Sequence, residues 1–310
     1  MSQNPIKPRA VRPGDTVGVV ASAAAVEREY LERGVSALGA MGYRVKVSPR
    51  ALARDGILAG SDRERADELK AFFADPEVKA IFGARGGYGC GRLLPLLDFA
   101  ALARLPKAFI GFSDATFILN ALVARSRMVC FHGPMVAMDF AHGLTPRALA
   151  HLRGLLSGEI AGFTLEAREV VRQGAGAGEL VGGCLSVVTA MLATPWVPDF
   201  TGRVLFLEDT GEKAYRIDRM LVQLRQAGVL ERVAGIVFGA IRVPDNDEAE
   251  QRLTLEFIRQ QTRGLRCPVL FGVEAGHGTE NLTLPFGLTA RIDGARGRMM
   301  VDESAVTIGE

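Results

Sequence analysis

The sequence predicts an α/β fold, with a parallel sheet in the first half of the chain and a smaller mixed β/α domain in the second. In the first half, short apolar runs alternate with segments whose apolar residues recur at helical spacing, the pattern of parallel strands joined by helices. In the second half, similar runs lead into a tail that alternates apolar and polar residues about glycines, as antiparallel strands do. With 310 residues, 48% of them hydrophobic, the chain is long enough for two cores.

The first half is expected to alternate strands and helices. A strand at Thr16–Ala21 precedes a helix at Glu27–Met41, and Ser61 is a suitable N-cap for the helix DRERADELKAFFAD that follows it. The apolar residues of that helix fall on one side. Further strands are expected at Tyr43–Val47, Lys79–Gly83, Ala108–Phe112 and Met128–Phe131, with the glycine-rich turn GARGGYGCG after the second of these.

The second half begins after a polar, glycine-rich stretch that ends in QGAGAGELVGG and predicts a linker. We therefore place one domain at residues 1–165, the linker at 166–181 and a second domain at 182–310. The second domain is expected to contain strands at Gly202–Leu207, Ala234–Ile241 and Pro268–Val273, helices at Ala214–Ala227 and Glu248–Thr262, the loop EAGHGTEN and an antiparallel tail.

Composition and charge exclude several classes of protein. The 37 basic and 35 acidic residues leave a net charge of +2, so we expect neither nucleic acid nor a membrane surface as a partner. No secretory signal or membrane-spanning run is evident, which favours the cytoplasm. The four cysteines are single, and the histidines lack a zinc-site spacing, so we expect reduced thiols and no metal.

Ser113 stands at the turn between an apolar strand and an apolar helix, in the stretch KAFIGFSDATFILNAL. Gly111 and Ala115 flank it in the small-x-Ser-x-small pattern of a nucleophile elbow, where small neighbours let the hydroxyl project. A helix cap is the alternative, since serine is an ordinary N-cap residue, and this stretch alone favours the cap.

Two further residues supply the groups that activate a serine. Glu208 ends an apolar strand, and His277 lies in the glycine-flanked loop AGHGTEN. With Ser113 they provide a hydroxyl, a base and an orienting carboxylate, the groups of acyl transfer. Alternatively, Glu208 is a solvated or ion-paired residue and His277 a structural one. Ser22 and His132 are weaker candidates for the nucleophile and the base.

The glycine-rich turn predicts an oxyanion hole. Gly86 and Gly87 are able to turn backbone N–H groups toward a carbonyl oxygen, joined by the N–H of Asp114. A plain turn is the alternative; a dinucleotide site is not, because no G-x-G-x-x-G register fits. Arg85 and Arg216 are candidates to bind a substrate carboxylate, or else surface ion-pair residues.

Five ordered motifs resemble the LD-carboxypeptidases, serine peptidases of the muramoyl-tetrapeptide carboxypeptidase type. They are ARGGYG at 84–89, IGFSDAT at 110–116, FHGP at 131–134, FLED followed by YRIDRML, and GHGTENLTLPFG at 276–287. This resemblance replaces the cap interpretation of Ser113. One departure is visible: the family motif often written GGNL reads Gly182-Gly183-Cys184-Leu185, so the substrate contact expected there falls to Cys184, a weaker donor.

The resemblance implies a Ser113–Glu208–His277 triad, a Rossmann-like first domain that carries the serine, and a smaller second domain that brings the other two residues. It also implies a homodimer that needs no cofactor. The expected activity is removal of the terminal D-alanine from murein tetrapeptides at an L,D bond. The alternatives are a peptidase of the microcin C immunity type and a noncatalytic muropeptide-binding protein.

Overall fold

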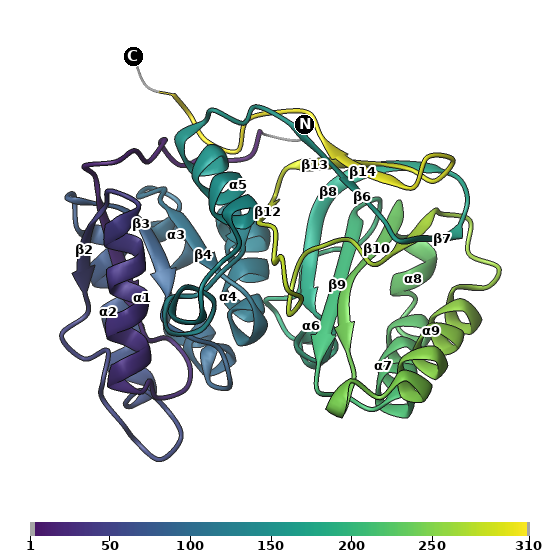
Figure 1. The fold of residues 1–310 in the computed structure, drawn as a ribbon, viewed down its shortest axis with the longest axis horizontal. Helices are drawn as coiled ribbons and strands as arrows, with labels where there is room; N and C mark the ends of the chain where they lie inside the picture. The colour runs from purple at the N-terminus through teal and green to yellow at the C-terminus, as the bar shows by residue number, and fades with distance from the viewer. Residues whose placement is uncertain (1–3, 309–310) are drawn as a thin grey trace. The chain divides into compact units, whose positions relative to one another are not determined.

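The computed structural model describes residues 4–308, which fold into two compact units. Of the described residues, the first unit contains 4–161, Leu282–Gly287 and 304–308, and the second contains Gly162–Asn281 and Leu288–Glu303. Each unit has its own sheet with helices (Figure 1). The predicted α/β class is confirmed. Within the described range, no helix is both long enough and apolar enough to cross a bilayer.

Parallel strands dominate the sheet of the first unit. Its strands are β1 (Thr16–Val20), β2 (Arg44–Val47), β3 (Val78–Gly83), β4 (Ala108–Gly111), β5 (Cys130–His132) and β12 (Leu284–Phe286). They lie in the order β12-β5-β4-β3-β1-β2, and only β12 runs antiparallel to its neighbour. Apolar side chains from the central strands, such as Val19, Ile81 and Phe109, are fully buried. The parallel sheet predicted for the first half is therefore confirmed.

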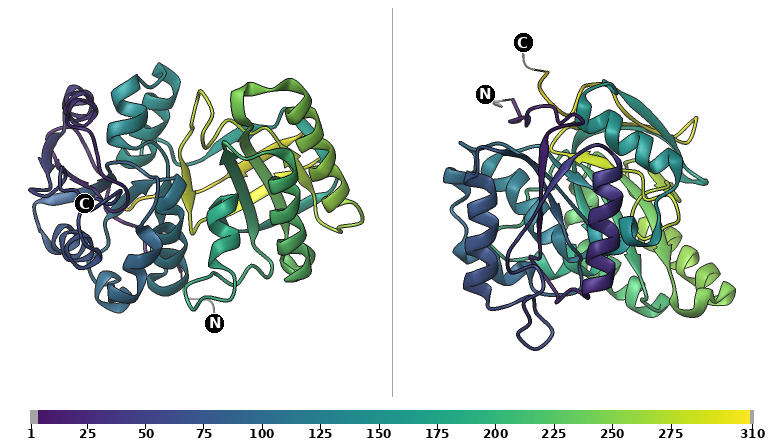
Figure 2. Two further views of the ribbon diagram at one scale, coloured as in Figure 1. Left: turned by 90° about the horizontal axis from the view of Figure 1, so that it is seen from below. Right: turned by 60° about the vertical axis from the view of Figure 1, so that its left-hand side comes forward.

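Helices flank both faces of this sheet. They are α1 (Arg28–Ala40), α2 (Asp62–Ala74), α3 (Phe99–Leu102), α4 (Thr116–Ala121) and α5 (Pro146–Ser157), and Figure 2 shows α1 and α2 on either side of the strands. The predicted cap of α2 is confirmed. Ser61 accepts from the N–H of Glu64, whose carboxylate accepts from the N–H of Ser61, so two donors at the helix start are satisfied.

The order of the strands reverses between β1 and β3. The connection after β1 leads through α1 to β2 at one edge, whereas β3 leads to β4 on the other side. Loops diverge at such a point, and in open α/β sheets the crevice beyond the strand ends is the usual ligand site. The loop after β1 contains Ser22, and the turn after β3 contains Arg85, Gly86 and Gly87.

A buried arginine on α2 joins the loops at this point. Arg65 is 1% exposed, and its guanidinium donates to the carbonyl oxygens of Ser22 at 2.5 Å, Gly89 at 3.1 Å and Gly60 at 3.2 Å. Its remaining charge is matched by Asp62, 2.5 Å away. A buried charge is tolerated only when it is paired and hydrogen-bonded, and here its partners are the backbone of three separate loops.

The second unit is built on a mixed sheet. Its strands are β6 (Phe163–Glu166), β7 (Glu169–Arg172), β8 (Ala175–Cys184), β9 (Val204–Thr210), β10 (Gly235–Arg242), β11 (Val269–Phe271), β13 (Thr289–Asp293) and β14 (Arg298–Val301). They lie in the order β6-β14-β13-β8-β9-β10-β11-β7, with β8 to β11 mutually parallel. The antiparallel pairing of β13 and β14 confirms the prediction for the tail.

Four helices belong to the second unit: α6 (Leu185–Met191), α7 (Ala214–Gln226), α8 (Val229–Arg232) and α9 (Glu248–Thr262). α7 and α9 lie side by side (Figure 1). The buried face of α7 consists of Ala214, Ile217, Leu221 and Leu224. This spacing repeats every three to four residues, as expected for one face of a helix, and matches the amphipathic pattern that predicted it.

The predicted linker at 166–181 is wrong, because most of these residues lie in β6, β7 and β8. Glycine serves here for close approach of backbones rather than for flexibility. A Cβ added to Gly176 would lie 2.0 Å from the carbonyl oxygen of Ala234, and one added to Gly178 would lie 2.1 Å from that of Gly202. Only glycine fits against these neighbours, so a glycine-rich composition was misread as a flexible segment.

The predicted second domain at 182–310 also needs correction. Leu282–Gly287 and residues 304–308 belong to the first unit. β12 in the first of these segments pairs with β5, and Arg9 forms a bridge with Thr307 in the second. Likewise the predicted first domain, 1–165, ends at Ala161, because β6 follows in the sheet of the second unit. These assignments depend on pairing between distant residues, which no local pattern reports.

We predict that Arg65→Met lowers the free energy of unfolding by about 3 kcal/mol, because it leaves buried carbonyl oxygens without donors. Arg63→Met is the matched control: Arg63 lies on the same helix, its side chain is 86% exposed, and its ion pair with Asp67 spans 3.9 Å. We expect a change below about 0.5 kcal/mol for the control. Urea denaturation of both variants measures the difference. Equal, small losses would show that Arg65 does not brace the loops.

Candidate active site

Ser113 lies at a strained turn directly after β4. Its backbone has φ 57°, in the left-handed region, and its side chain is only partly buried. The chain then makes a 3₁₀ turn at Ser113–Ala115 and enters α4. No side-chain capping hydrogen bond is made at the start of either element, so the serine does not act as a cap. A non-glycine residue in this conformation costs about 1–2 kcal/mol, which is typical of functional turns.

Small residues surround the turn for a steric reason. A Cβ added to Gly86 would lie 2.8 Å from both the Cβ and the Oγ of Ser113, and one added to Gly111 would lie 3.0 Å from the Cβ of Ala115. The small-x-Ser-x-small pattern thus corresponds to real contacts. The turn after β3 and the turn after β4 are in van der Waals contact, which places a glycine backbone against the serine hydroxyl.

The glycine-rich turn carries backbone donors of the kind predicted. Gly87 has φ +102°, a conformation that favours glycine, and it is exposed, whereas Gly86 is buried. Among the described residues, the N–H groups of Gly86 and Gly87 have no acceptor. The carbonyl oxygen of Gly86 accepts from the N–H of Ala24 at 3.3 Å, which orients the peptide. These two N–H groups are therefore suited to bind an oxygen supplied by a ligand.

The side chain of Asp114 ties this turn to the serine. One carboxylate oxygen accepts from the N–H of Cys90 at 2.7 Å, at the start of a 3₁₀ turn, Cys90–Leu96. Asp114 is 4% exposed, and burial raises its pKa, while the Cys90 N–H acts in the opposite direction. Asp114 was predicted to contribute its backbone N–H to the oxyanion hole. Its side chain also has a structural role, because it connects the two turns.

Arg85 and Ser22 lie on the loops of the same strand ends. Arg85 donates from Nη1 to the carbonyl oxygen of Ala25 at 3.2 Å, so part of its guanidinium holds the loop after β1. Its Nε is buried without an acceptor among residues 4–308, as is the Oγ of Ser22. Ser22 is 5% exposed, which suits the wall of a site better than an attacking group. Substrate binding by Arg85 stays a prediction.

Glu208 and His277 are hydrogen-bonded in the second unit. Glu208 lies on β9 and is fully buried, and its Oε2 lies 2.6 Å from Nδ1 of His277 and 3.0 Å from the backbone nitrogen of the same residue. A carboxylate at Nδ1 fixes the neutral imidazole with its proton on that nitrogen, so Nε2 is the nitrogen that accepts. The side chain of His277 is 18% exposed, so it reaches the surface. This is the geometry of a base and its orienting acid.

The loop that carries His277 is shaped by close packing. Gly276 has φ +90°, and a Cβ there would lie 2.5 Å from the carboxylate of Glu208, so glycine is required. The N–H of Gly276 donates to Oδ1 of Asn281 at 3.1 Å, and Asn281 is 1% exposed. Asn281 was not among the predicted site residues, although it lies in the same sequence motif as His277.

The remaining predicted binding residues lie in the second unit. Cys184 is opposite Glu208 in the pairing of β8 with β9 and is 5% exposed; burial raises the pKa of its thiol well above the ordinary value, as does the Glu208 charge. The thiol is therefore protonated and lies 3.2 Å from the hydroxyl of Ser186. Arg216 is exposed, 3.3 Å from the hydroxyl of Tyr215 and 3.4 Å from the carboxylate of Glu212. Substrate contacts by both residues stay predictions.

His132, the weaker candidate for the base, is a core residue. It ends β5, is fully buried, and its ring stacks on Phe286 at 5.4 Å and meets Phe112 edge-on at 5.8 Å. Aromatic packing of this kind explains its burial. The motif FHGP alone did not show whether His132 lies in a buried strand or in an exposed loop.

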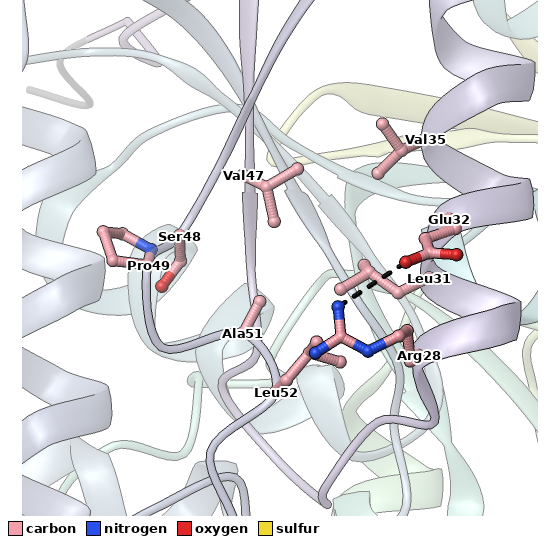
Figure 3. A pocket seen from close by; sticks show the side chains of 9 residues that line it. All are labelled: Arg28, Leu31, Glu32, Val35, Val47, Ser48, Pro49, Ala51 and Leu52. Carbon is pink, nitrogen blue, oxygen red and sulfur yellow. Dashed lines mark ion pairs between the residues drawn. The ribbon is translucent and has the colours of Figure 1, made fainter.

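The first unit also has a small, mainly apolar hollow. It has a volume of about 240 Å³ and lies between α1 and the segment after β2 (Figure 3). Apolar side chains including Leu31, Val35 and Val47 line it, and the ion pair of Arg28 with Glu32, 3.5 Å apart, lies at its side. None of the predicted site residues is among its lining. Among the described residues, no cluster of three or more His, Cys, Asp and Glu side chains is arranged to hold a metal.

Asp209, adjacent to Glu208, is a second buried carboxylate and was not among the predicted site residues. It is 3% exposed and accepts from the N–H groups of Ser186 and Thr210, each at 2.8 Å, so it holds the first turn of α6. Burial raises its pKa to about 6; the Ser186 N–H opposes this and the Glu208 charge adds to it.

We predict that Asp209→Asn changes how stability depends on pH. The folded pKa of about 6 lies above the unfolded value of about 4, so protonation favours the folded state: this stability is fully present below about pH 4 and lost as the pH rises through about 6. Between pH 4 and 7, the unfolding free energy of the variant minus that of the wild type should rise by on the order of 2 kcal/mol, measured by urea denaturation.

Asp199→Asn is the control, because the Thr201 N–H lowers the pKa of Asp199 and so predicts a change of opposite sign. A difference that stays flat for Asp209→Asn would contradict a raised pKa.

Comparisons with known proteins cover both units. The family model described as the LD-carboxypeptidase N-terminal domain matches residues 17–133, and that of the LD-carboxypeptidase C-terminal domain matches residues 177–292. A probable murein peptide carboxypeptidase of Bacillus subtilis is 36% identical, over 98% of this chain and 96% of its own. The microcin C7 self-immunity protein of Escherichia coli is 26% identical, over 90% of this chain and 91% of its own.

Among solved structures, the muramoyltetrapeptide carboxypeptidase of Oxalobacter formigenes is 32% identical, with a TM-score of 0.82 over 92% of this chain and 97% of its own. The two matched domains span most of the chain and include Ser113, Glu208 and His277. This chain therefore belongs to the LD-carboxypeptidase family.

Proposed function

We propose that this carboxypeptidase removes the terminal D-alanine from murein tetrapeptides, by cleaving the bond between an L-configured centre and the D-residue. The relatives described as murein peptide and muramoyltetrapeptide carboxypeptidases support the substrate. The observation that carries the mechanism is the 2.6 Å contact between Nδ1 of His277 and the buried carboxylate of Glu208. Such a pair prepares an imidazole to accept a proton, which favours catalysis over binding alone.

In the proposed mechanism, Ser113 Oγ attacks the scissile carbonyl carbon and passes its proton to Nε2 of His277. Glu208 stabilises the imidazolium that forms. The N–H groups of Gly86 or Gly87 and of Asp114 bind the oxygen of the tetrahedral intermediate. Collapse of that intermediate breaks the C–N bond, and His277 returns its proton to the leaving amine of D-alanine. Water, deprotonated by His277, then hydrolyses the acyl-enzyme and restores Ser113.

The mechanism requires the groups of the first unit to meet those of the second around one substrate. The strained turn at Ser113 and the donors of the glycine-rich turn support the first half of the site. The hydrogen-bonded Glu208 and His277 support the second. We further propose that the protein is a cytoplasmic homodimer. It needs no cofactor and has neither nucleic acid nor a membrane as partner. Size-exclusion chromatography coupled to light scattering tests the dimer.

Substitution of the triad tests the mechanism directly. We predict that Ser113→Ala, Glu208→Ala and His277→Ala each lower kcat by at least about 10³-fold, because each removes one of three groups that act together. Mass spectrometry of a murein tetrapeptide after incubation measures the loss of one alanine, and circular dichroism checks that each variant folds. Full activity of any one variant would remove that residue from the mechanism.

Gly86→Ala tests the turn that packs against the serine. The added methyl would lie 2.8 Å from Ser113 Oγ, so either the serine or the backbone donors must move, and we predict a fall in kcat of about 10²-fold or more. Gly39→Ala is the control: Gly39 is exposed on α1, and a Cβ there meets nothing within 4 Å. That variant should keep full activity and gain up to about 1 kcal/mol of stability. Equal activity of the two variants would contradict the assignment.

The relative that confers self-immunity to microcin C7 supports one alternative substrate, an acyl-nucleotide-like antibiotic. Incubation of the protein with that compound and with a murein tetrapeptide, in parallel, distinguishes the two. A serine-directed phosphonate tests the remaining alternative, a noncatalytic muropeptide-binding protein, because a protein without an activated serine stays unlabelled at Ser113.

A further inference from the structure

An exposed arginine lies next to the loop of the proposed base. Arg242 ends β10, at the same end of the sheet as Glu208 on the neighbouring β9, and it pairs with Thr210 across the two strands. Its Nη1 donates to the carbonyl oxygen of His277 at 3.4 Å. The guanidinium is thus attached to the backbone of the residue that the mechanism uses as its base.

A second contact fixes the other end of the guanidinium. Nη2 of Arg242 donates to Oδ1 of Asn246 at 3.2 Å. Asn246 and its neighbour Asp245 have φ 52° and 56°, so two consecutive non-glycine residues adopt the left-handed conformation in this short loop. Such a loop persists only where surrounding contacts hold it, and here it presents an amide oxygen to Arg242.

Among the residues that the structure describes, the charge of Arg242 has no opposite partner. Within residues 4–308, no carboxylate lies within 4.0 Å of its guanidinium, and its two acceptors are a backbone oxygen and an uncharged amide. Arg216, the residue of this unit that was predicted to bind a substrate carboxylate, differs because it pairs with Glu212. A guanidinium has five N–H groups, so Arg242 keeps three donors, enough for a bidentate bond to a carboxylate.

A guanidinium in this position suits a carboxypeptidase, because it is able to bind a terminal carboxylate through two parallel hydrogen bonds. The terminal carboxylate and the scissile nitrogen are attached to the same α-carbon of the leaving residue, so they lie a few ångströms apart. In the proposed mechanism His277 gives its proton to that nitrogen. The group that recognises the carboxylate must therefore lie close to the base.

We propose that Arg242 binds the terminal carboxylate of the substrate and so restricts cleavage to the last residue of a peptide. This inference rests on the proposed function, since it assigns the leaving residue to the side of His277 that carries Arg242. Asn246 is then a positioning residue that holds the planar guanidinium in one orientation. Arg85, the rival predicted from sequence, shares its guanidinium with the carbonyl oxygen of Ala25.

The test compares two substrates that differ only at the recognised group: a murein tetrapeptide with a free terminal carboxylate and the same peptide ending in D-alaninamide. Wild-type protein should prefer the free acid in kcat/KM. In Arg242→Gln, kcat/KM should fall by about 10- to 100-fold for the acid and change little for the amide, so the preference collapses. Arg242→Lys should give an intermediate preference, because lysine keeps the charge without the fork.

Arg252→Gln is the matched control, an exposed arginine on α9 that pairs with Glu248, and it should keep the wild-type preference. If Arg242→Gln retains the preference, or Arg85→Gln alone abolishes it, the assignment to Arg242 is wrong while the proposed function stands. If wild-type protein releases no D-alanine from the free tetrapeptide, the proposed function itself is wrong.

Discussion

The left-handed backbone at Ser113 is the constraint on which the arrangement of the first unit depends. A serine with φ 57° is stable only if its surroundings determine its conformation, and several features of the unit do this. Gly86 packs on the hydroxyl, and Asp114 binds the N–H of Cys90 in the neighbouring turn. Arg65 in turn holds the carbonyl oxygen of Gly89 together with that of Ser22. The strained conformation of Ser113 thus lies among loops whose backbone atoms are held by the carboxylate of Asp114 and the buried charge of Arg65.

In the second unit, two neighbouring carboxylates lie on one buried strand. Side chains of successive strand residues point to opposite faces, so Glu208 and Asp209 have different partners. Glu208 binds the side chain and the backbone of His277, while Asp209 binds the first turn of α6. The raised pKa of Asp209 reflects its burial and the nearby charge of Glu208. The strand therefore provides one carboxylate that is hydrogen-bonded to the proposed base and another that anchors a helix.

Arg242 extends this arrangement to the substrate. An imidazole oriented by a carboxylate is common to many hydrolases, and by itself it does not select the end of a peptide. A guanidinium hydrogen-bonded to the backbone of the same histidine adds that selectivity, because the hydrogen bond keeps the positive charge close to the proposed base. Specificity for a terminal residue then follows from two hydrogen bonds that orient Arg242, to His277 and to Asn246.

Local residue patterns made Ser113, Glu208 and His277 candidates, but the stretch around Ser113 alone favoured a helix cap, and the triad came from the resemblance to the LD-carboxypeptidases. For the parallel strands of the first unit, the cap at Ser61 and the antiparallel tail, local patterns were enough. These features depend on periodicity, capping chemistry and residue type, all of which act over a few neighbouring residues. Only the tertiary structure decided that most of 166–181 forms strands, that β12 joins the first unit and that His132 belongs to the core. It alone also identified the backbone contacts of Arg65, Asp209 and Arg242. Each of these depends on contacts between distant segments: a glycine that gives flexibility and one that admits a neighbouring backbone have the same letter, and a charged residue gains its role only from the atoms that folding brings beside it.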